Sequence, residues 1–326
     1  MLILVSIHSP FAMWNIPAEH VSRLRREFPR HTFLHATGDV QSQALIPEAD
    51  IAFSSQIGRE QLAVARRLHW IHSPSAGVGS MLYREMVDSE VQITNSRGLA
   101  ADTMAEHILA VTLALFRQLP LALARQAERV WAQDEISARG NRLLTGARVL
   151  MIGAGAIGAA TARRMALLGA IVTGIRRRPS GPPLEGFARL TTPTDLTKEL
   201  SAADVIVVAA PHTAETRGMI AGPQFRAMQR HAVLVNVSRG RLVDEQALAT
   251  ALASETIGGA ALDVFEQEPL PQSSALWMAP NVLITPHTSG FRADHWDAAT
   301  ELFAENLRRF ESGGPLLNLV DKAAGY

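Results

Sequence analysis

A glycine-rich turn near the middle of the chain is the feature that most constrains its fold. The turn, Gly153-Ala154-Gly155-Ala156-Ile157-Gly158, follows the apolar run Val149–Ile152 and precedes Ala159–Leu168, which has helical spacing. A second apolar run, Ile171–Ile175, comes next, so the order is strand, turn, helix and strand. In such a unit the glycines allow a tight turn, a close backbone approach to a pyrophosphate, and packing of helix on strand. The phosphates lie at the helix N-terminus, where unpaired N–H groups favour negative charge. The sequence therefore predicts a dinucleotide site.

The residues before this unit must form a separate domain. A chain of 326 residues is long enough for two domains. In its first part, short apolar runs alternate with helical patterns, which predicts a parallel sheet covered by helices on both faces. Strands are predicted at Leu2–Ile7, Thr32–His35, Ile51–Ser54, Trp70–Ile71 and Val91–Thr94, and helices at Ala18–Phe28, Arg59–Leu68 and Met81–Val87.

The second domain is predicted to begin with a long helix that Asp102 caps and that Pro120 kinks or ends. Leu121–Arg142 reads as a further helix followed by an arm, and Pro179–Pro183 as a connection. Later strands are predicted at Val205–Ala209, Ala232–Asn236, Gly259–Leu262 and Val282–Ile284, before an amphipathic helix at Trp296–Phe310. The tail is too short for a third domain, so we expect it to return to the first. The expected domains are 1–97 with 289–326, and 98–288.

The composition excludes several classes of partner. Lys and Arg number 31, as do Asp and Glu, so no overall charge attracts nucleic acid or a membrane surface. No apolar stretch is long enough to span a bilayer, and the short opening run Met1–Ile7 reads as a strand rather than a signal peptide. The chain has no cysteine, which rules out disulfides and thiolate chemistry and suits a reducing cytoplasm.

Three later stretches each follow a predicted strand and contain, in order, Arg239, Glu268 and His287. Alone, each has a plainer interpretation: a surface charge, a solvated turn beside a proline, and a structural histidine. Together they match hydride transfer to a 2-oxo acid. An arginine fork can bind a carboxylate and polarise a carbonyl. A histidine can protonate the developing alkoxide, and a neighbouring carboxylate favours its imidazolium form. Ligands bind at the carboxyl ends of strands in such sheets, so we expect these residues to meet there.

The chain resembles the D-isomer-specific 2-hydroxyacid dehydrogenase family, in its glyoxylate/hydroxypyruvate reductase-like branch, from about Leu68 to Asp321. The matching residues are His69–Ile71, Ser75–Val78, Asn95, Gly98, Ala105–His107, Gly153–Gly158, Pro211–Thr213, Thr216–Arg217, Ser238–Gly240, Asp263, Glu268–Pro269, Pro286–His287, Leu302–Phe310 and Pro315–Asn318. The resemblance implies an α/β fold of two doubly wound parallel-sheet domains, a flavodoxin-like substrate domain and a Rossmann cofactor domain, with the active site in the cleft. It also implies a homodimer joined through the cofactor domain, for which Leu121–Arg142 is our candidate contact.

The resemblance assigns roles to individual residues. Arg239 would bind the substrate's carboxylate and 2-oxo group, His287 would donate the proton, and Glu268 would hydrogen-bond His287. Backbone amides near Ala76, Gly77 and Val78 would also hold the carboxylate. The cofactor would contact Thr103, Gly153, Gly155, Ala156, Ile157, Gly158, Pro211, Thr216, Val237 and Asp263, with Asp263 at the nicotinamide end and Pro211 and Thr216 along the adenosine side.

One departure concerns the choice of cofactor. Where NAD-using members of the family carry an acidic residue for the ribose 2′-hydroxyl, this chain has Arg176, followed by Arg177 and Arg178. No carboxylate repels a 2′-phosphate there, and a guanidinium can bind it. We therefore expect NADP(H) to be preferred, with NAD(H) as the alternative and a solvated basic run as the plainer interpretation.

The expected activity is reduction of small 2-oxo acids, with glyoxylate and hydroxypyruvate as the leading substrate classes. A larger 2-hydroxy acid remains an alternative, as does a nucleotide-sensing interaction protein of the same fold. Phosphoglycerate dehydrogenase is less favoured because the chain ends at Tyr326, and formate dehydrogenase because Glu268 stands where that branch has an amide. We expect His107 to be structural, and Trp70 and Trp296 to lie in the core or at an interface. His72 and Ser75 lie near the presumed substrate loop and are weaker candidates for shaping substrate specificity. No cluster has metal-ligand spacing.

Overall fold

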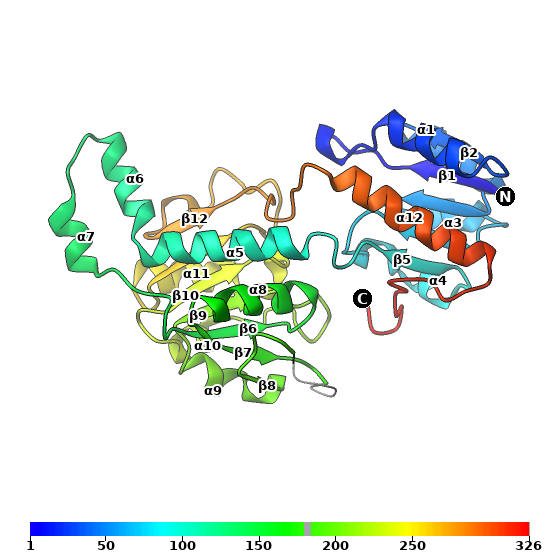
Figure 1. The fold of residues 1–326 in the computed structure, drawn as a ribbon. Helices are drawn as coiled ribbons and strands as arrows, with labels where there is room; N and C mark the ends of the chain where they lie inside the picture. Colours follow the sequence, from blue (N-terminus) through cyan, green and yellow to red (C-terminus); the bar gives the residue numbers. More distant parts are fainter. Residues whose placement is uncertain (179–183, 326) are drawn as a thin grey trace. The chain divides into compact units, whose positions relative to one another are not determined.

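The structure is a computed structural model that describes residues 1–178 and 184–325, and it divides into two compact units (Figure 1). One unit combines Met1–Leu99 with Arg292–Tyr326, and the other is Ala100–Phe291. The sequence placed these boundaries after residues 97 and 288. The predicted connection Pro179–Pro183 lies outside the described residues.

The first unit is built on a five-stranded sheet in the order β2-β1-β3-β4-β5, and all its strand pairs are parallel. Its strands are β1 (Leu2–Ser6), β2 (Thr32–Ala36), β3 (Ile51–Ser54), β4 (Trp70–Ser73) and β5 (Gln92–Asn95). Its α-helices are α1 (Ala18–Glu27), α2 (Asp39–Leu45), α3 (Arg59–Val64), α4 (Arg84–Asp88) and α12 (His295–Glu311). Short 3₁₀ turns are η1 (Ala12–Trp14), η2 (Ile46–Glu48) and η3 (Gly79–Met81). This strand order is the flavodoxin-like one.

Helix α12 explains why this unit is discontinuous in sequence. Its buried residues Phe303 and Leu307 pack with Ile3, Val5 and Phe53 of the sheet. Phe303 stacks on Phe53 with ring centroids 4.4 Å apart. Burying such side chains stabilises the fold by roughly 1.5–3 kcal/mol each, so the C-terminal helix belongs to the core of the N-terminal sheet.

The second unit contains a seven-stranded parallel sheet in the order β12-β11-β10-β9-β6-β7-β8. Its strands are β6 (Arg148–Ile152), β7 (Ile171–Ile175), β8 (Arg189–Thr191), β9 (Val205–Val208), β10 (Val233–Asn236), β11 (Gly259–Leu262) and β12 (Val282–Ile284). Its α-helices are α5 (Ala101–Phe116), α6 (Leu119–Ala127), α7 (Gln133–Arg139), α8 (Ala156–Leu167), α9 (Leu196–Leu200), α10 (Gly222–Ala227) and α11 (Glu245–Ala253). The 3₁₀ turns are η4 (Pro193–Asp195), η5 (Gly240–Leu242) and η6 (Ala275–Met278). Two α/β units with parallel sheets confirm the predicted fold class.

Alternating residues of each central strand face opposite helical layers. In β6, Val149 and Met151 join the cluster that contains residues of α5 and α8. Leu150 joins the cluster that contains residues of α10 and α11. Side chains alternate with a period of two along a strand, so a strand covered on both faces is apolar throughout. This explains the uninterrupted apolar runs in the sequence.

Several boundaries differ from those predicted. Helix α5 begins at Ala101 with Ala100 at the N-cap, so Asp102 is not the cap; it lies in the first turn, and its carboxylate is 3.0 Å from Arg164. An acidic side chain in the first turn still complements the helix dipole. The helix ends at Phe116, before Pro120, which occupies the first turn of α6. Proline is tolerated there because that N–H needs no helical partner.

Candidate active site

The ends of three neighbouring parallel strands bring together the groups that the sequence singled out. β10 ends at Asn236, β11 at Leu262 and β12 at Ile284, and these strands are paired side by side. Arg239, Glu268 and His287 follow them in that order. The carboxyl edge of an open parallel sheet is where such proteins bind their ligands.

His287 and Glu268 form a hydrogen-bonded pair. Nδ1 of His287 lies 2.7 Å from Oε2 of Glu268, and Oε1 of Glu268 accepts the backbone N–H of Phe265 at 3.0 Å. Burial alone would raise the pKa of Glu268, but the bonds from His287 and Phe265, with the charges of His287 and Arg239, outweigh burial and lower it. Glu268 is therefore a carboxylate at neutral pH, and its position fixes Nδ1 as the side of the imidazole ring that faces it.

Arg239 lies in the electrostatic field of this pair. Desolvation lowers the pKa of its guanidinium and the charge of Glu268 opposes that effect, so Arg239 remains a cation facing the same site. Its Nη1 donates to the carbonyl of Ser238 at 2.6 Å. A carboxylate ligand would find a planar cationic donor beside an imidazole and its acidic partner.

Gly240 allows the two loops that carry Arg239 and Glu268 to touch. A Cβ at this glycine would lie 1.9 Å from the carbonyl carbon of Phe265 and 2.2 Å from the nitrogen of Glu266. Real Cβ atoms do not approach backbone so closely, so any other residue would push the loops apart. The sequence displays this glycine, but its packing role depends on a contact that the sequence alone could not place.

Asp263 organises the loop that carries His287. Its carboxylate is buried, and Oδ1 accepts the Thr285 hydroxyl at 2.6 Å and the Thr288 N–H at 2.8 Å. Oδ2 accepts the N–H of Ser289 at 3.0 Å. A buried carboxylate needs such partners. Thr285, Thr288 and Ser289 were not predicted as site residues; the available signal was that hydroxyl side chains lie on both sides of His287 in the sequence.

Three arginines lie close to His212. The pKa of His212 is lowered, first by desolvation and then by the positive charges of Arg241, Arg217 and Arg239. Arg217 and Arg241 also line a cavity of about 360 Å³ with Gly218, Asp244, Glu266 and Gln267. These arginines place positive charge beside the carboxylates Asp244 and Glu266, which line the same cavity.

The glycine-rich turn fits a dinucleotide. Gly153 has φ +109°, and a Cβ there would lie 2.6 Å from the backbone of Ala209. A Cβ at Gly158 would lie 2.2 Å from the carbonyl oxygen of Gly153, whereas a Cβ at Gly155 meets nothing within 4 Å. Two glycines are thus required by the fold, and the third leaves open space. Helix α8 begins at Ala156, so the N–H groups of Ala156 and Ile157 belong to its unpaired first turn.

The other predicted cofactor residues lie in different settings. Arg176 and Arg177 directly follow β7 and are exposed, and Arg177 lies 3.7 Å from Glu215. Within the described chain the Arg176 guanidinium has no hydrogen-bond or ion-pair partner, while its backbone N–H donates to Thr191. Thr216 and Pro211 belong to one loop, in which the Thr216 hydroxyl donates to the Pro211 carbonyl at 2.7 Å. Val237 is buried after β10, and Thr103 lies in the first turn of α5.

The predicted substrate loop lies in the first unit. Ala76, Gly77 and Val78 follow β4, and none of their three backbone N–H groups has a hydrogen-bond partner among the described residues. Such a run of free donors can receive an anion. Asn95 fixes the loop by donating to the Ala76 carbonyl at 2.7 Å.

His72, near this loop in the sequence, has no exposed surface. It is fully buried between Phe53 and Phe303, its Nδ1 lies 2.7 Å from the Thr94 hydroxyl, and burial lowers its pKa to about 3. His72 is therefore a neutral core residue, and the idea that it shapes specificity is wrong. Ser75 is half-buried in the loop. Trp70, also fully buried, is core as expected.

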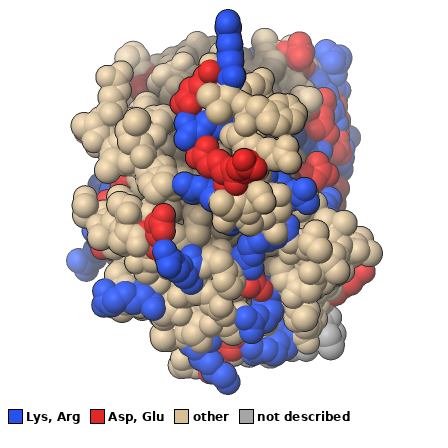
Figure 2. Space-filling model, turned by 90° about the vertical axis from the view of Figure 1, so that its left-hand side faces the viewer, with Lys and Arg blue, Asp and Glu red and all other residues tan. Residues whose placement is uncertain are grey.

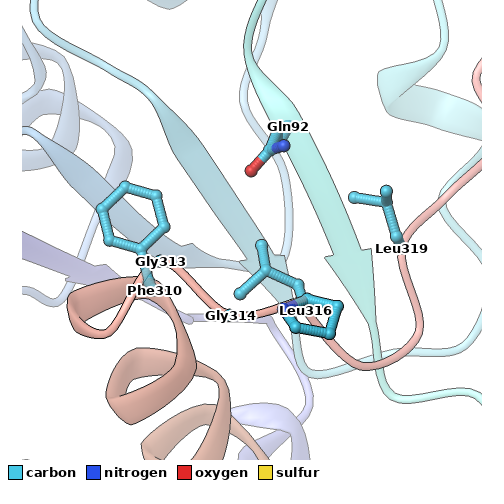
Figure 3. Close-up of a pocket in the computed structure, with 7 residues that line it drawn as sticks. Gln92, Phe310, Gly313, Gly314, Leu316 and Leu319 are labelled. Carbon is cyan, nitrogen blue, oxygen red and sulfur yellow. The ribbon is translucent and has the colours of Figure 1, made fainter.

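A separate pocket in the first unit lacks chemistry of this kind. It has a volume of about 330 Å³ and lies between β5 and the segment after α12 (Figure 3). None of its lining residues, Gln92, Phe310, Gly313, Gly314, Pro315, Leu316 and Leu319, is titratable.

Across residues 1–178 and 184–325, no cluster of His, Cys, Asp and Glu could hold a metal ion. In the same residues no single helix could cross a membrane, although α5 and α6, bent by 69°, pass that test together.

Comparison with known proteins identifies the family. Residues 109–289 match the NAD-binding domain of D-isomer specific 2-hydroxyacid dehydrogenases. A glyoxylate reductase of Korarchaeum cryptofilum is 33% identical over 82% of this chain and 80% of its own length. The chain therefore belongs to the D-isomer specific 2-hydroxyacid dehydrogenase family and is an NAD(P)-dependent oxidoreductase, which confirms the resemblance.

Solved structures agree with this assignment. A D-isomer specific 2-hydroxyacid dehydrogenase family protein from Aeromonas salmonicida is 33% identical, with a TM-score of 0.84 over 98% of this chain and 99% of its own. An NADPH-dependent glyoxylate/hydroxypyruvate reductase from Sinorhizobium meliloti, solved with NADP and sulfate, is 27% identical, with a TM-score of 0.84 over 100% and 99%. The similarity thus covers both units of the chain.

Proposed function

We propose that this protein reduces small 2-oxo acids of the glyoxylate and hydroxypyruvate type to D-2-hydroxy acids, with NADPH as the preferred reductant. The observation that carries the proposal is the hydrogen-bonded pair of His287 and Glu268 with Arg239 in its field. The glyoxylate reductases among the relatives support the substrate class.

Each residue has a distinct role in the proposed reaction. Arg239 binds the substrate carboxylate and polarises the 2-oxo group, and the free N–H groups of Ala76, Gly77 and Val78 supply further donors to the carboxylate. NADPH, when bound, would supply the hydride that C2 accepts. His287 gives its proton to the oxygen that becomes the hydroxyl, so one C–H and one O–H bond replace the carbonyl π bond. Glu268 keeps the imidazolium charged and oriented.

Arg176 supports the preference for NADPH. It directly follows β7, the strand next to β6, in the position where this fold recognises the ribose 2′ group. Its exposed guanidinium has no partner among the described side chains, so it is available to a 2′-phosphate. Arg177, although engaged with Glu215, adds positive charge to the same turn.

We also propose a homodimer through the arm formed by α6 and α7, which projects from the rest of its unit (Figure 1). The ion pair of Arg125 with Glu135, at 2.7 Å, ties the two helices together. Leu123 is 59% exposed and Trp131 is 89% exposed. Figure 2 shows the face that carries the arm, where uncharged residues lie between interspersed charges. Light scattering should give the mass of a dimer, and Trp131→Asp with Leu123→Asp should give a monomer.

A cytoplasmic location completes the proposal, because a cysteine-free chain suits a reducing compartment.

The experiment that tests the function is a panel of 2-oxo acids assayed with NADPH and with NADH. Glyoxylate and hydroxypyruvate should support the fastest oxidation, with higher kcat/KM for NADPH. Faster turnover of a larger 2-oxo acid would move the substrate class to larger substrates. Negligible oxidation of NADPH and NADH across the panel would refute the proposed reductase activity and favour a nucleotide-sensing protein.

A further inference from the structure

A short series of side chains connects helix α5 to the loop that carries His287. Nε2 of His107, on α5, lies 3.4 Å from the hydroxyl oxygen of Thr285, which directly follows β12. The same hydroxyl lies 2.6 Å from Oδ1 of Asp263, which directly follows β11. His107, Thr285 and Asp263 therefore connect helix α5 with the two loops that follow β11 and β12, and the second of these loops carries His287.

The chemistry of the groups fixes the direction of these hydrogen bonds. The Asp263 carboxylate can only accept, so the Thr285 hydroxyl donates its proton to it. The Thr285 oxygen then has only lone pairs to offer His107, so Nε2 of His107 must carry a proton and donate. Burial lowers the pKa of His107, and the charge of Asp263 opposes this shift. A neutral ring protonated at Nε2 satisfies both observations.

Asp263 transmits this arrangement to His287. Besides the bonds of its carboxylate to Thr288 and Ser289, its backbone carbonyl accepts the N–H of His287 at 2.9 Å. His287 has φ +55°, in the left-handed region that non-glycine residues rarely adopt. Such a conformation persists only where neighbouring bonds hold it. The Asp263 carboxylate therefore helps to hold the backbone that carries the imidazole.

We infer that His107 is a positioning residue for the proposed reduction: it holds Thr285 in the rotamer that bonds Asp263, and so keeps the His287 loop in place. The inference rests on the proposed function. It differs from the expectation that His107 is merely structural, because it requires a hydrogen-bond donor at one point in space rather than a side chain that fills volume.

Two amide substitutions separate these roles. Gln at position 107 can place its amide nitrogen near the site of Nε2, whereas Asn, one methylene shorter, can match only the position of Nδ1. His107→Asn and His107→Leu should lower kcat about 5-fold, which corresponds to one hydrogen bond, with KM for NADPH changed less than kcat. His107→Gln should retain kcat to within about 2-fold. Equal losses in the Gln and Asn variants would overturn the inference.

A measurement independent of turnover examines the loop itself. Amide hydrogen exchange of the cofactor-free protein should be faster at Thr288 and Ser289 in His107→Asn than in the wild type, and unchanged in His107→Gln. In a Thr285→Val background, His107→Asn should have no additional effect on exchange or kcat, because the intermediary is already lost. Additive effects, or exchange that is unchanged in His107→Asn, would contradict the inference.

His231 provides a matched control. Its Nε2 likewise makes a side-chain hydrogen bond, to Asp204 Oδ1 at 2.8 Å, but His231 precedes β10 and so lies at the amino end of that strand. His231→Asn should leave kcat unchanged. A wild type that oxidises no NADPH with any 2-oxo acid would refute the proposed function, whereas an active wild type with fully active His107→Asn would refute only the role of His107.

Discussion

The imidazole of His287 and the carboxylate of Glu268 lie 2.7 Å apart, and the second oxygen of that carboxylate is held by the N–H of Phe265. The pair joins the ends of two neighbouring strands, β11 and β12. Its geometry is fixed from both sides, so the proton that His287 would donate is carried at a defined place.

Glu268→Gln should lower kcat for 2-oxo acid reduction by roughly 100-fold, within the range expected for a group that supports general acid catalysis. An amide cannot stabilise the imidazolium as a carboxylate does. When pH is raised, the rate of the variant should therefore start to decline at a lower pH than the rate of the wild type. A pH profile of kcat measures both effects. Unchanged profiles would show that the pair has no part in proton transfer.

The lowered pKa of Glu268 has its own consequence at acid pH. A depressed carboxylate stays ionised until the pH falls through its folded pKa, so the pair should persist below the usual range for glutamate, about pH 4.3. The side-chain carboxyl resonance of Glu268, followed by NMR, should keep the chemical shift of a carboxylate as pH falls from 6 to about 4.5. Rupture of the pair well above that range would contradict the assignment.

The two glycines of the turn should behave differently. Gly158→Ala places a Cβ against the Gly153 carbonyl and should cost about 1–3 kcal/mol of folding stability, as overpacking does. Gly155→Ala meets no protein atom, so its melting temperature should match the wild type while its KM for NADPH rises. Thermal melts and cofactor titrations distinguish the two. Equal melting temperatures in both variants would argue against this packing.

Arg176→Asp should raise KM for NADPH by about 10-fold or more, since a charge-assisted bond to phosphate is lost, and should leave KM for NADH nearly unchanged. Arg230→Asp makes the same charge change at the amino end of β10, where Arg230 pairs with Glu255 at 2.8 Å. This control variant should alter neither the KM for NADPH nor the KM for NADH. A wild type that prefers NADH would remove the role assigned to Arg176.

Asp204 should contribute to stability rather than activity. Burial alone would raise its pKa, but the N–H of Arg148, with His231 and Arg142, lowers it. A depressed carboxylate stabilises the fold at all pH values above its unfolded pKa, about 3.9, and loses that contribution as pH falls through its folded pKa. Asp204→Asn should lower the stability at pH 7 by about 1–3 kcal/mol and narrow the difference from wild type at pH 3. Denaturant unfolding at both pH values measures it.

The sequence predicted the parallel sheets because their strands are apolar on both faces, as in β9 and β10, and such runs are unmistakable. It did not predict where α8 begins, because Ala156 and Ile157 lack the polar residues that mark a helix start. Asp102 looks like a cap, yet the cap is Ala100, since the chain enters α5 two residues earlier than its polar residues indicate.

The candidate site was predictable only in part, because some of its contacts depend on side-chain and backbone conformations that the sequence does not reveal. Arg239, Glu268 and His287 follow strands, so the rule for parallel sheets brings them together. The bonds of Asp263 to Thr285, Thr288 and Ser289 depend on side-chain rotamers and on the left-handed backbone of His287. His72, close in sequence to the presumed substrate loop, proved to be core because β4 directs it inward against Phe303.

The most direct test of the account is single-turnover oxidation of NADPH by glyoxylate in the wild type and in His287→Gln. The variant should bind NADPH with unchanged affinity and oxidise it at least 100-fold more slowly, the loss expected when a general acid is removed. Oxidation by the variant at the wild-type rate would contradict the claim that His287 donates the proton.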